Sequence, residues 1–183
     1  MSGPDPGVGG PAATSSAGSA TGPERTPDDR YIVVGGRRWR ASDPSIPEAL
    51  RRELVAELMT GRRLVRTRKD EVRPRVHDAK VALGERGDPW WDPTPDGRRA
   101  RLAATMRALL RHRDGSTICP SDAARVCGGD DWRCLMPTAR EVAADLVRCG
   151  DAVVLQRGEQ VAPDDVASVR GPVRVGPGPD LLH

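Results

Sequence analysis

Turn and capping residues divide residues 97–175 into short segments, and the order of those segments constrains the fold more than any other feature of the sequence. The first segment, GRRARLAATMRALLRHRDG, places Leu102, Met106 and Leu109 at helical spacing, and Gly115 marks its end. Thr117-Ile118 follows as a short strand candidate. The pattern therefore predicts an amphipathic helix followed by a strand.

Capping patterns predict two further helices in this part of the chain. Ser121 is placed to cap a brief helix that Gly128-Gly129 ends. Thr138 begins the sequence TARE, which has the spacing of a capping box, and Pro137 disfavours a helix that starts further upstream. A third helix is therefore expected from Thr138 to Gly150.

A hairpin completes the order of segments. Residues 152–156 and 159–161 read as strands joined by Arg157-Gly158, and residues 171–175 are a further strand candidate. Helix, strand, helix, helix, hairpin is the order of a winged helix. The predicted fold class is α+β and mainly helical, with a C-terminal winged helix preceded by a β-hairpin and a helical hairpin.

The two preceding hairpins are predicted from residues 31–92. Gly35-Gly36 is a tight-turn signature between two short strands. SIPE, at residues 45–48, has the capping-box spacing, and Leu50, Leu54 and Leu58 then form the apolar stripe of a helix expected to end near Gly61. A second helix is expected to begin at Pro74.

Composition sets the predicted domain boundaries. Residues 1–29 consist mostly of Gly, Pro, Ala, Ser and Thr, which bury too little apolar surface to offset the entropy of ordering, so a disordered tail is predicted. The rest of the chain is predicted to comprise a β-hairpin and helical hairpin region at 30–92, a linker at 93–97, a winged-helix domain at 98–176 and a flexible tail at 177–183. Because the sequence has no apolar run of the roughly 20 residues that span a bilayer and no secretory signal pattern, we expect a cytoplasmic protein without membrane contact.

The four cysteines raise the question of a metal site. Seven, six and fourteen residues separate Cys119, Cys127, Cys134 and Cys149, whereas zinc sites usually include a pair two to four residues apart. The sequence therefore predicts reduced, metal-free thiols that fill the core, with Trp132 closing the gap between the second and third of these helices.

Sequence motifs for catalysis are absent, so no enzyme activity, catalytic residue or cofactor is predicted. His77 and His112 lie far apart in the sequence and have no nucleophile pattern beside them. Thiol chemistry at Cys119, which precedes a predicted helix, is the one redox hypothesis that the sequence leaves open.

Particular segments carry a family resemblance. Residues 98–175, with ICPS and DWRCLMP, resemble a family of bacterial domains of unknown function that are assigned a winged-helix fold. Residues 31–92, with VHDAKVALGERG and PWW, are similar to small uncharacterised proteins from high-GC bacteria, some of which carry a biopolymer-transport (Tol) label. The sequence lacks the membrane span, signal peptide and propeller repeat that such a label implies. The resemblance implies a fold and no established activity.

Residues 62–75 form the most basic window of the chain, with seven basic and two acidic residues. They are predicted to form a loop between the helices. Such a cluster suits phosphate contacts, because it gathers counterions that a nucleic acid would displace. It also suits a solvated loop in an arginine-rich chain, in which only Lys69 and Lys80 among 29 basic residues are lysine.

Two functions are compatible with these patterns. The first is a regulator that binds double-stranded DNA through the third helix and the wing, with the basic window assisting. Its candidate binding residues are Arg133, Thr138, Arg140, Arg148, Arg157, Arg62, Arg63, Arg66 and Arg68. The second is a protein-interaction module, which the equal numbers of acidic and basic residues in the third helix suit equally well. The oligomeric state stays open.

Overall fold

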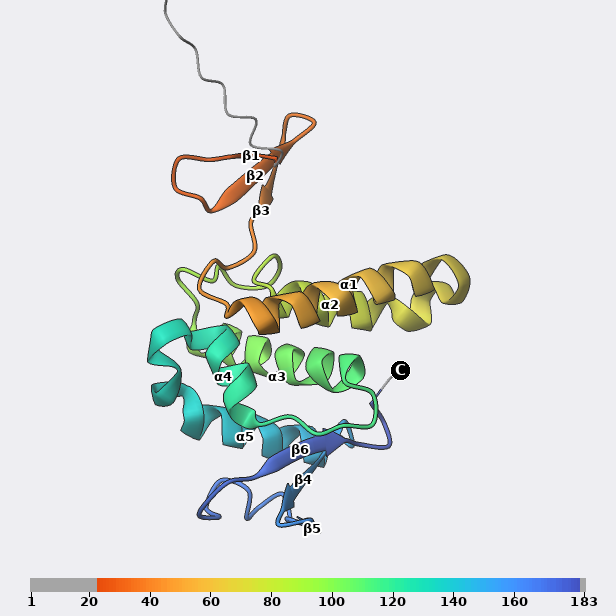
Figure 1. Cartoon of the computed structure of the whole chain (residues 1–183), viewed down its shortest axis with the longest axis vertical. Helices are drawn as coiled ribbons and strands as arrows, with labels where there is room; N and C mark the ends of the chain where they lie inside the picture. The colour runs from red at the N-terminus through yellow and green to blue at the C-terminus, as the bar shows by residue number, and fades with distance from the viewer. Residues whose placement is uncertain (1–22, 182–183) are drawn as a thin grey trace, which may run out of the picture.

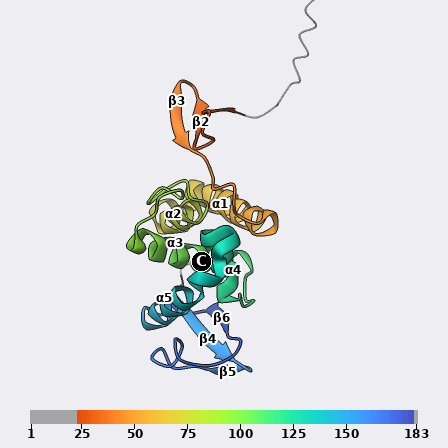
Figure 2. The ribbon, with the colours of Figure 1, turned by 90° about the vertical axis from the view of Figure 1, so that its left-hand side faces the viewer.

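The structure, a computed structural model, describes residues 23–181 and places its elements in layers along the longest axis of the molecule (Figure 1). A β-ribbon lies at one end, followed by α1 and α2, then α3, then α4 and α5, and finally a second small sheet (Figures 1 and 2). The α+β class is confirmed. None of the helices within these residues has the length and hydropathy needed to cross a membrane. The elements are β1 Glu24–Arg25, β2 Tyr31–Val34, β3 Arg37–Arg40, α1 Glu48–Arg68, η1 Lys69–Val72, α2 Arg73–Ala82, α3 Pro95–His112, α4 Pro120–Gly128, η2 Gly129–Leu135, α5 Met136–Arg148, β4 Ala152–Gln156, β5 Glu159–Gln160 and β6 Arg174–Pro177.

The ribbon contains the predicted hairpin and one additional strand. Gly35 and Gly36 both have positive φ, as the tight turn between β2 and β3 requires. β1 pairs antiparallel with β2, so the predicted disordered tail of residues 1–29 is wrong at its C-terminal end. Thr26 makes this pairing possible, because its backbone N–H and hydroxyl both bond to Tyr31. Residues 1–22 lie outside the described residues.

Two tryptophans fix the ribbon to the helical layers. Trp91 packs edge-on against Tyr31 of β2, with ring centroids 5.7 Å apart, and Trp90 packs edge-on against Trp91 at 5.1 Å. The Trp90 indole N–H donates to the Ala41 carbonyl at 3.1 Å. Arg40 of β3 donates to the carbonyls of Gly87 and Asp88. One face of the ribbon is therefore anchored to the chain that follows α2.

The helical hairpin is longer than predicted. α1 continues through Gly61 to Arg68, and a 3₁₀ turn leads directly into α2, so the predicted loop at residues 62–75 is wrong. A Cβ at Gly61 would lie 2.9 Å from Cγ2 of Val76, so the glycine permits close packing of α1 on α2 instead of ending the helix. Ser45, the predicted cap, donates its hydroxyl to Asp43.

The central helix α3 packs against α1, α2, α4 and α5. Its large buried apolar residues belong to one hydrophobic core that extends from Ile46 to Leu181, and these are Leu102, Met106, Leu109 and Leu110. Thr94 caps α3 by accepting a hydrogen bond from the Gly97 N–H, so the predicted linker at 93–97 contains the start of this helix. The predicted domain boundary therefore does not coincide with a break in the core.

Asp88 holds the cap of α3 in place. Its carboxylate accepts hydrogen bonds from the Thr94 hydroxyl at 2.5 Å and the Thr94 N–H at 3.0 Å. These bonds lower the pKa of the Asp88 carboxyl below its ordinary value. A lowered pKa in the folded state means that the stabilisation is complete above the ordinary aspartate pKa and is lost as the pH falls through the lower, folded value.

We therefore expect Asp88→Asn to lower the melting temperature at pH 7. The difference from the unmodified protein should shrink as the pH falls below about 4, where the wild-type carboxylate becomes protonated. Melting curves by circular dichroism at a series of pH values test this. Asp92→Asn, at an exposed position nearby, is the control; a difference for Asp88→Asn that does not change with pH would contradict the assigned role of the carboxylate.

The two helices of the C-terminal half begin earlier than predicted. Cys119 is the cap residue of α4, with its backbone N–H pointing to the Asp122 carboxylate, so Ser121 lies inside the helix. α5 begins at Met136 and includes Pro137 in its first turn, where a missing N–H has no cost. Thr138 is therefore not its cap. Trp132 packs against the core between these helices, as predicted.

The second sheet has the order β5-β4-β6, and Ile118 bridges to Val175 of β6. The predicted turn at Arg157-Gly158 is confirmed, with positive φ at both residues. Residues 177–183 were predicted to be a flexible tail, but Leu181 is buried and the Asp180 N–H donates to the Gly150 carbonyl. That prediction is wrong up to Leu181, and residues 182–183 lie outside the described residues.

Candidate functional site

The predicted binding residues on α5 form bonds within the protein. The Arg140 guanidinium donates to the carbonyls of Val169 and Gly171, at 2.6 and 2.5 Å, and so fastens the segment between β5 and β6 onto α5. Arg148 pairs with Asp145 and Asp164. The Asp164 carboxylate, as hydrogen-bond acceptor, raises the pKa of Arg148. Both arginines therefore have structural partners.

The outer face of α5 also carries exposed carboxylates. Arg99 of α3 donates to Glu141 at 2.6 Å and to Asp145 at 2.8 Å, and the bond to Glu141 is the main cause of its raised pKa. These charges are matched within the C-terminal half. α5 consequently presents a nearly neutral surface, in agreement with its sequence.

Three candidates of the C-terminal half remain. Thr138 is half-buried in the first turn of α5, whereas Arg133 and Arg157 are exposed. Arg133 lies over the Trp132 ring at 4.6 Å, and Arg125 lies over the same ring at 4.2 Å. Arg157 occupies the turn between β4 and β5 with φ of 53°. Arg157 is thus exposed to solvent at the edge of the second sheet.

Residues 62–75, named here the basic tip, form the end of the helical hairpin, which extends beyond the end of α3 (Figure 1). Arg62, Arg63, Arg66 and Arg68 are exposed on the last turns of α1. Part of their role is structural, because positive charge near a helix C-terminus interacts favourably with the helix dipole. Arg75 is different, because it donates to both oxygens of the buried Glu57 carboxylate at 2.5 and 2.9 Å.

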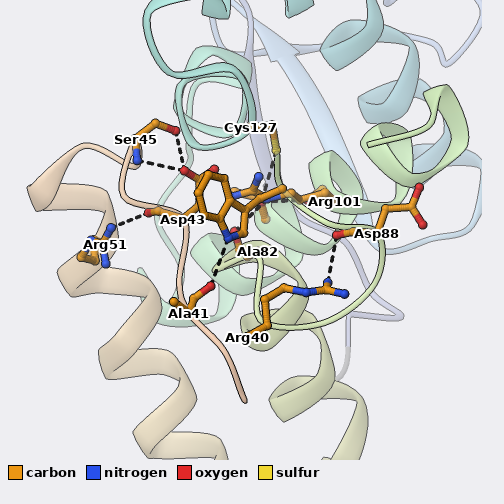
Figure 3. A network of polar contacts seen from close by, with 11 residues as sticks. Arg40, Ala41, Asp43, Ser45, Arg51, Ala82, Asp88, Arg101 and Cys127 are labelled. Carbon is orange, nitrogen blue, oxygen red and sulfur yellow. Dashed lines mark hydrogen bonds and ion pairs between the residues drawn. The ribbon is translucent and has the colours of Figure 1, made fainter. Parts of the chain in front are cut away.

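A buried polar network joins the chain before α1 to α3 (Figure 3). Arg101 and Asp43 form an ion pair with an N–O distance of 2.9 Å, and the Arg101 Nε–H donates to the Ala82 carbonyl. The second oxygen of Asp43 accepts from the N–H and the hydroxyl of Ser45. Arg51 also donates to the Asp43 carbonyl. The Nη2 atom of Arg101 is in ion-pair contact with Asp43 but forms no hydrogen bond with any of the described residues. Because the two charges of the network face each other in the interior, we assign it to stability.

The cysteines are less buried than predicted. Cys134 and Cys149 are exposed, so the core-filling prediction is wrong for both; they lie in η2 and just after α5. Cys127 packs beside Thr105, and burial raises the pKa of its thiol, which disfavours the reactive thiolate. Within residues 23–181, no group of three or more His, Cys, Asp or Glu residues is placed to hold a metal ion.

A groove between the ribbon and α1, which sequence analysis missed, gathers the large exposed apolar side chains of the described residues. It has a volume of about 730 Å³. Val34, Trp39, Val55 and Met59 line it, with 38–52% of their surface exposed. A signal existed in the sequence: Val55 and Met59 lie outside the Leu50, Leu54 and Leu58 stripe, and Trp39 stands among arginines. This surface is named here the apolar groove.

Comparison with known proteins finds a match for less than half of the chain. Residues 99–177 match a family described as "Protein of unknown function (DUF3253)". This range agrees with the resemblance noted for residues 98–175. The description names neither a winged helix nor a Tol system. The chain matches no curated protein.

Proposed function

We propose that the protein binds double-stranded DNA and that the basic tip supplies most of the phosphate contacts. The observation that carries this proposal is the position of four exposed arginines on the last turns of α1, at the end of a projecting helical hairpin. The arginines at 62, 63, 66 and 68 are exposed, so a phosphate backbone has access to them. Each arginine that reaches a phosphate releases counterions and so favours binding.

The C-terminal half supports the proposal by its topology. The order α3, Ile118, α4, α5, β4, β6 suits a winged helix, and so does the bridge from Ile118 to β6 beside β4. In this arrangement Arg157 would contact phosphates from the wing, while Thr138 and Arg133 would lie near the base edges. Because Arg140 and Arg148 have partners within the protein, α5 adds little free charge. We therefore expect weak binding with little sequence preference.

The salt dependence of binding tests this proposal. If the four exposed arginines on the last turns of α1 reach phosphates, the affinity for a short DNA duplex should fall with a log-log salt slope of about −3 to −4, since each contact releases about 0.9 counterion. Changing Arg63, Arg66 and Arg68 together to Gln should flatten that slope by about 2 to 3 units. Fluorescence anisotropy between 50 and 200 mM salt measures both slopes.

Arg52→Gln is the matched control, because Arg52 lies on the same helix with 73% of its side chain exposed. Its slope should equal that of the unmodified protein. Undetectable binding at the lowest salt would overturn the proposal. An unchanged slope in the triple variant would also overturn it, and would move the contacts away from the basic tip.

Protein binding is a second candidate function, favoured by a separate observation. The apolar groove leaves large side chains in solvent, and exposed apolar patches with a polar rim are typical of interaction sites. This function does not require the basic tip. It is therefore compatible with the first.

A further inference from the structure

The apolar groove has two walls that the fold builds from different elements. Arg25, Ile32 and Trp39 are direct partners across β1, β2 and β3, so their side chains share one face of the ribbon. Val34 joins that face two residues after Ile32. Val55 and Met59 stand one turn apart on α1 and form the opposite wall. The groove is therefore an apolar surface with contributions from both the ribbon and the helix.

Tyr31 and Arg40 hold the ribbon in place next to the groove. The opposite face of the ribbon carries Tyr31, which packs against Trp91, and Arg40 bonds to the carbonyls of Gly87 and Asp88. These contacts hold the ribbon at the end of the molecule, above the layer of α1 and α2 (Figures 1 and 2). Trp39 and Val34 on the ribbon are each 52% exposed. The apolar walls are therefore accessible to another molecule.

The charged residues around the groove indicate which kind of ligand it can bind. Arg25, Arg40, Arg62 and Lys80 line it beside a single acid, Glu85. The Glu85 carboxylate accepts a hydrogen bond from Ser42 at 2.9 Å, and Arg25 makes an exposed contact of 3.8 Å with Asp29. The rim therefore carries a net positive charge around an apolar centre. A ligand that matches it has apolar side chains flanked by carboxylates.

We infer that the apolar groove binds a short, acidic, amphipathic segment of a partner protein. The inference rests on the second candidate function and not on DNA binding. Large apolar side chains of the segment would pack between Trp39 and Met59, and its carboxylates would pair with Arg25 and Lys80. A volume of about 730 Å³ is in the range of sites that enclose a few side chains. A DNA backbone, which presents no apolar side chains, does not match these walls.

Peptide display on the full chain tests the inference. A library of random 16-residue peptides should yield binders with at least two large apolar residues and an excess of Asp and Glu. Trp39→Ser and Met59→Lys, on different elements, should each weaken the best peptide by about tenfold or more, as loss of a central apolar contact does. Because both positions are exposed, folding should persist, and circular dichroism verifies it. Val33→Ser, on the other face of β2, is the matched control.

Charge reversal provides the second arm. Lys80→Glu combined with Arg25→Glu should weaken acidic peptides and leave the DNA salt slope unchanged, while the triple glutamine variant of the basic tip should bind the peptides normally. Failure to enrich acidic apolar peptides, or binding that Met59→Lys does not weaken, overturns the inference. Dimerisation of the unmodified chain that Met59→Lys abolishes would also overturn the inference, because the groove would then be occupied by a second copy of this chain. Failure of DNA binding alone leaves these outcomes unchanged.

Discussion

Asp43→Ala is expected to lower the free energy of unfolding by about 3–5 kcal/mol, because it leaves the Arg101 guanidinium buried without its counter-charge. Only 3% of Asp43 and 6% of Arg101 are exposed, and the pair is 2.9 Å apart. The substitution also removes the acceptor of two bonds from Ser45. At about 2–4 °C per kcal/mol for a chain of this size, the melting temperature should fall by about 6–20 °C.

Urea unfolding followed by circular dichroism measures this change, and two further variants identify its cause. Glu48→Ala removes an ion pair whose two side chains are each 73% exposed, so its effect should stay within about 1 kcal/mol. Asp43→Leu combined with Arg101→Met should recover much of the loss, because apolar residues of similar size replace both buried charges. A loss for Asp43→Ala as small as that for Glu48→Ala would show that the pair is not the stabilising contact.

Local turn chemistry made the hairpins predictable from the sequence. Gly35-Gly36 and Arg157-Gly158 both have the positive φ values that a two-residue turn between twisted strands needs. Helical spacing likewise identified the buried stripe of α1, where Leu50, Leu54 and Leu58 all lie in the core. These features depend on residues close in sequence, so one sequence is enough to find them.

Features that depend on distant residues were not predictable in this way. Glycine in a helix interior costs about 1 kcal/mol relative to alanine, which favoured ending α1 near Gly61. The close approach of Val76 gives that glycine a packing role inside the helix. The position of Leu181 also depends on distant residues, because its side chain is buried in a core that the rest of the folded chain provides.

The candidate sites show the same limit. Sequence identified the arginines of α5, but the carbonyls of Val169 and Gly171 that occupy Arg140 come from a segment about 30 residues further along the chain. The basic tip was found by composition alone, although its helical structure was not. The apolar groove needed the ribbon to be placed beside α1. The spacing of apolar residues within one segment cannot predict a surface that two distant segments form together.

Leu54→Ala tests whether the core that links these segments unfolds as one unit. Leu54 is fully buried on α1, so the substitution should lower the free energy of unfolding by about 2–5 kcal/mol. α3 packs against α1 and α2 on one side and against α4 and α5 on the other. We therefore expect the lower free energy of unfolding to be seen also at β4, a strand that lies outside the helical hairpin. Amides of β4 that exchange by global unfolding should then exchange about 30- to 4,000-fold faster, at about 1.4 kcal/mol for each factor of ten.

Hydrogen exchange of the β4 amides, compared with those of α1, separates a single unit from two domains. Val55→Ala, at the next position and 38% exposed, is the control and should change exchange little at either place. Faster exchange confined to α1 and α2 would show that the helical hairpin opens by itself, and would support the boundary predicted at residues 93–97. Equal acceleration of amide exchange in α1 and β4 would instead show that the two halves of the chain unfold together through α3. The physical reason is that unfolding of the hairpin alone would expose part of the buried Leu102 and Met106 side chains of α3 to water.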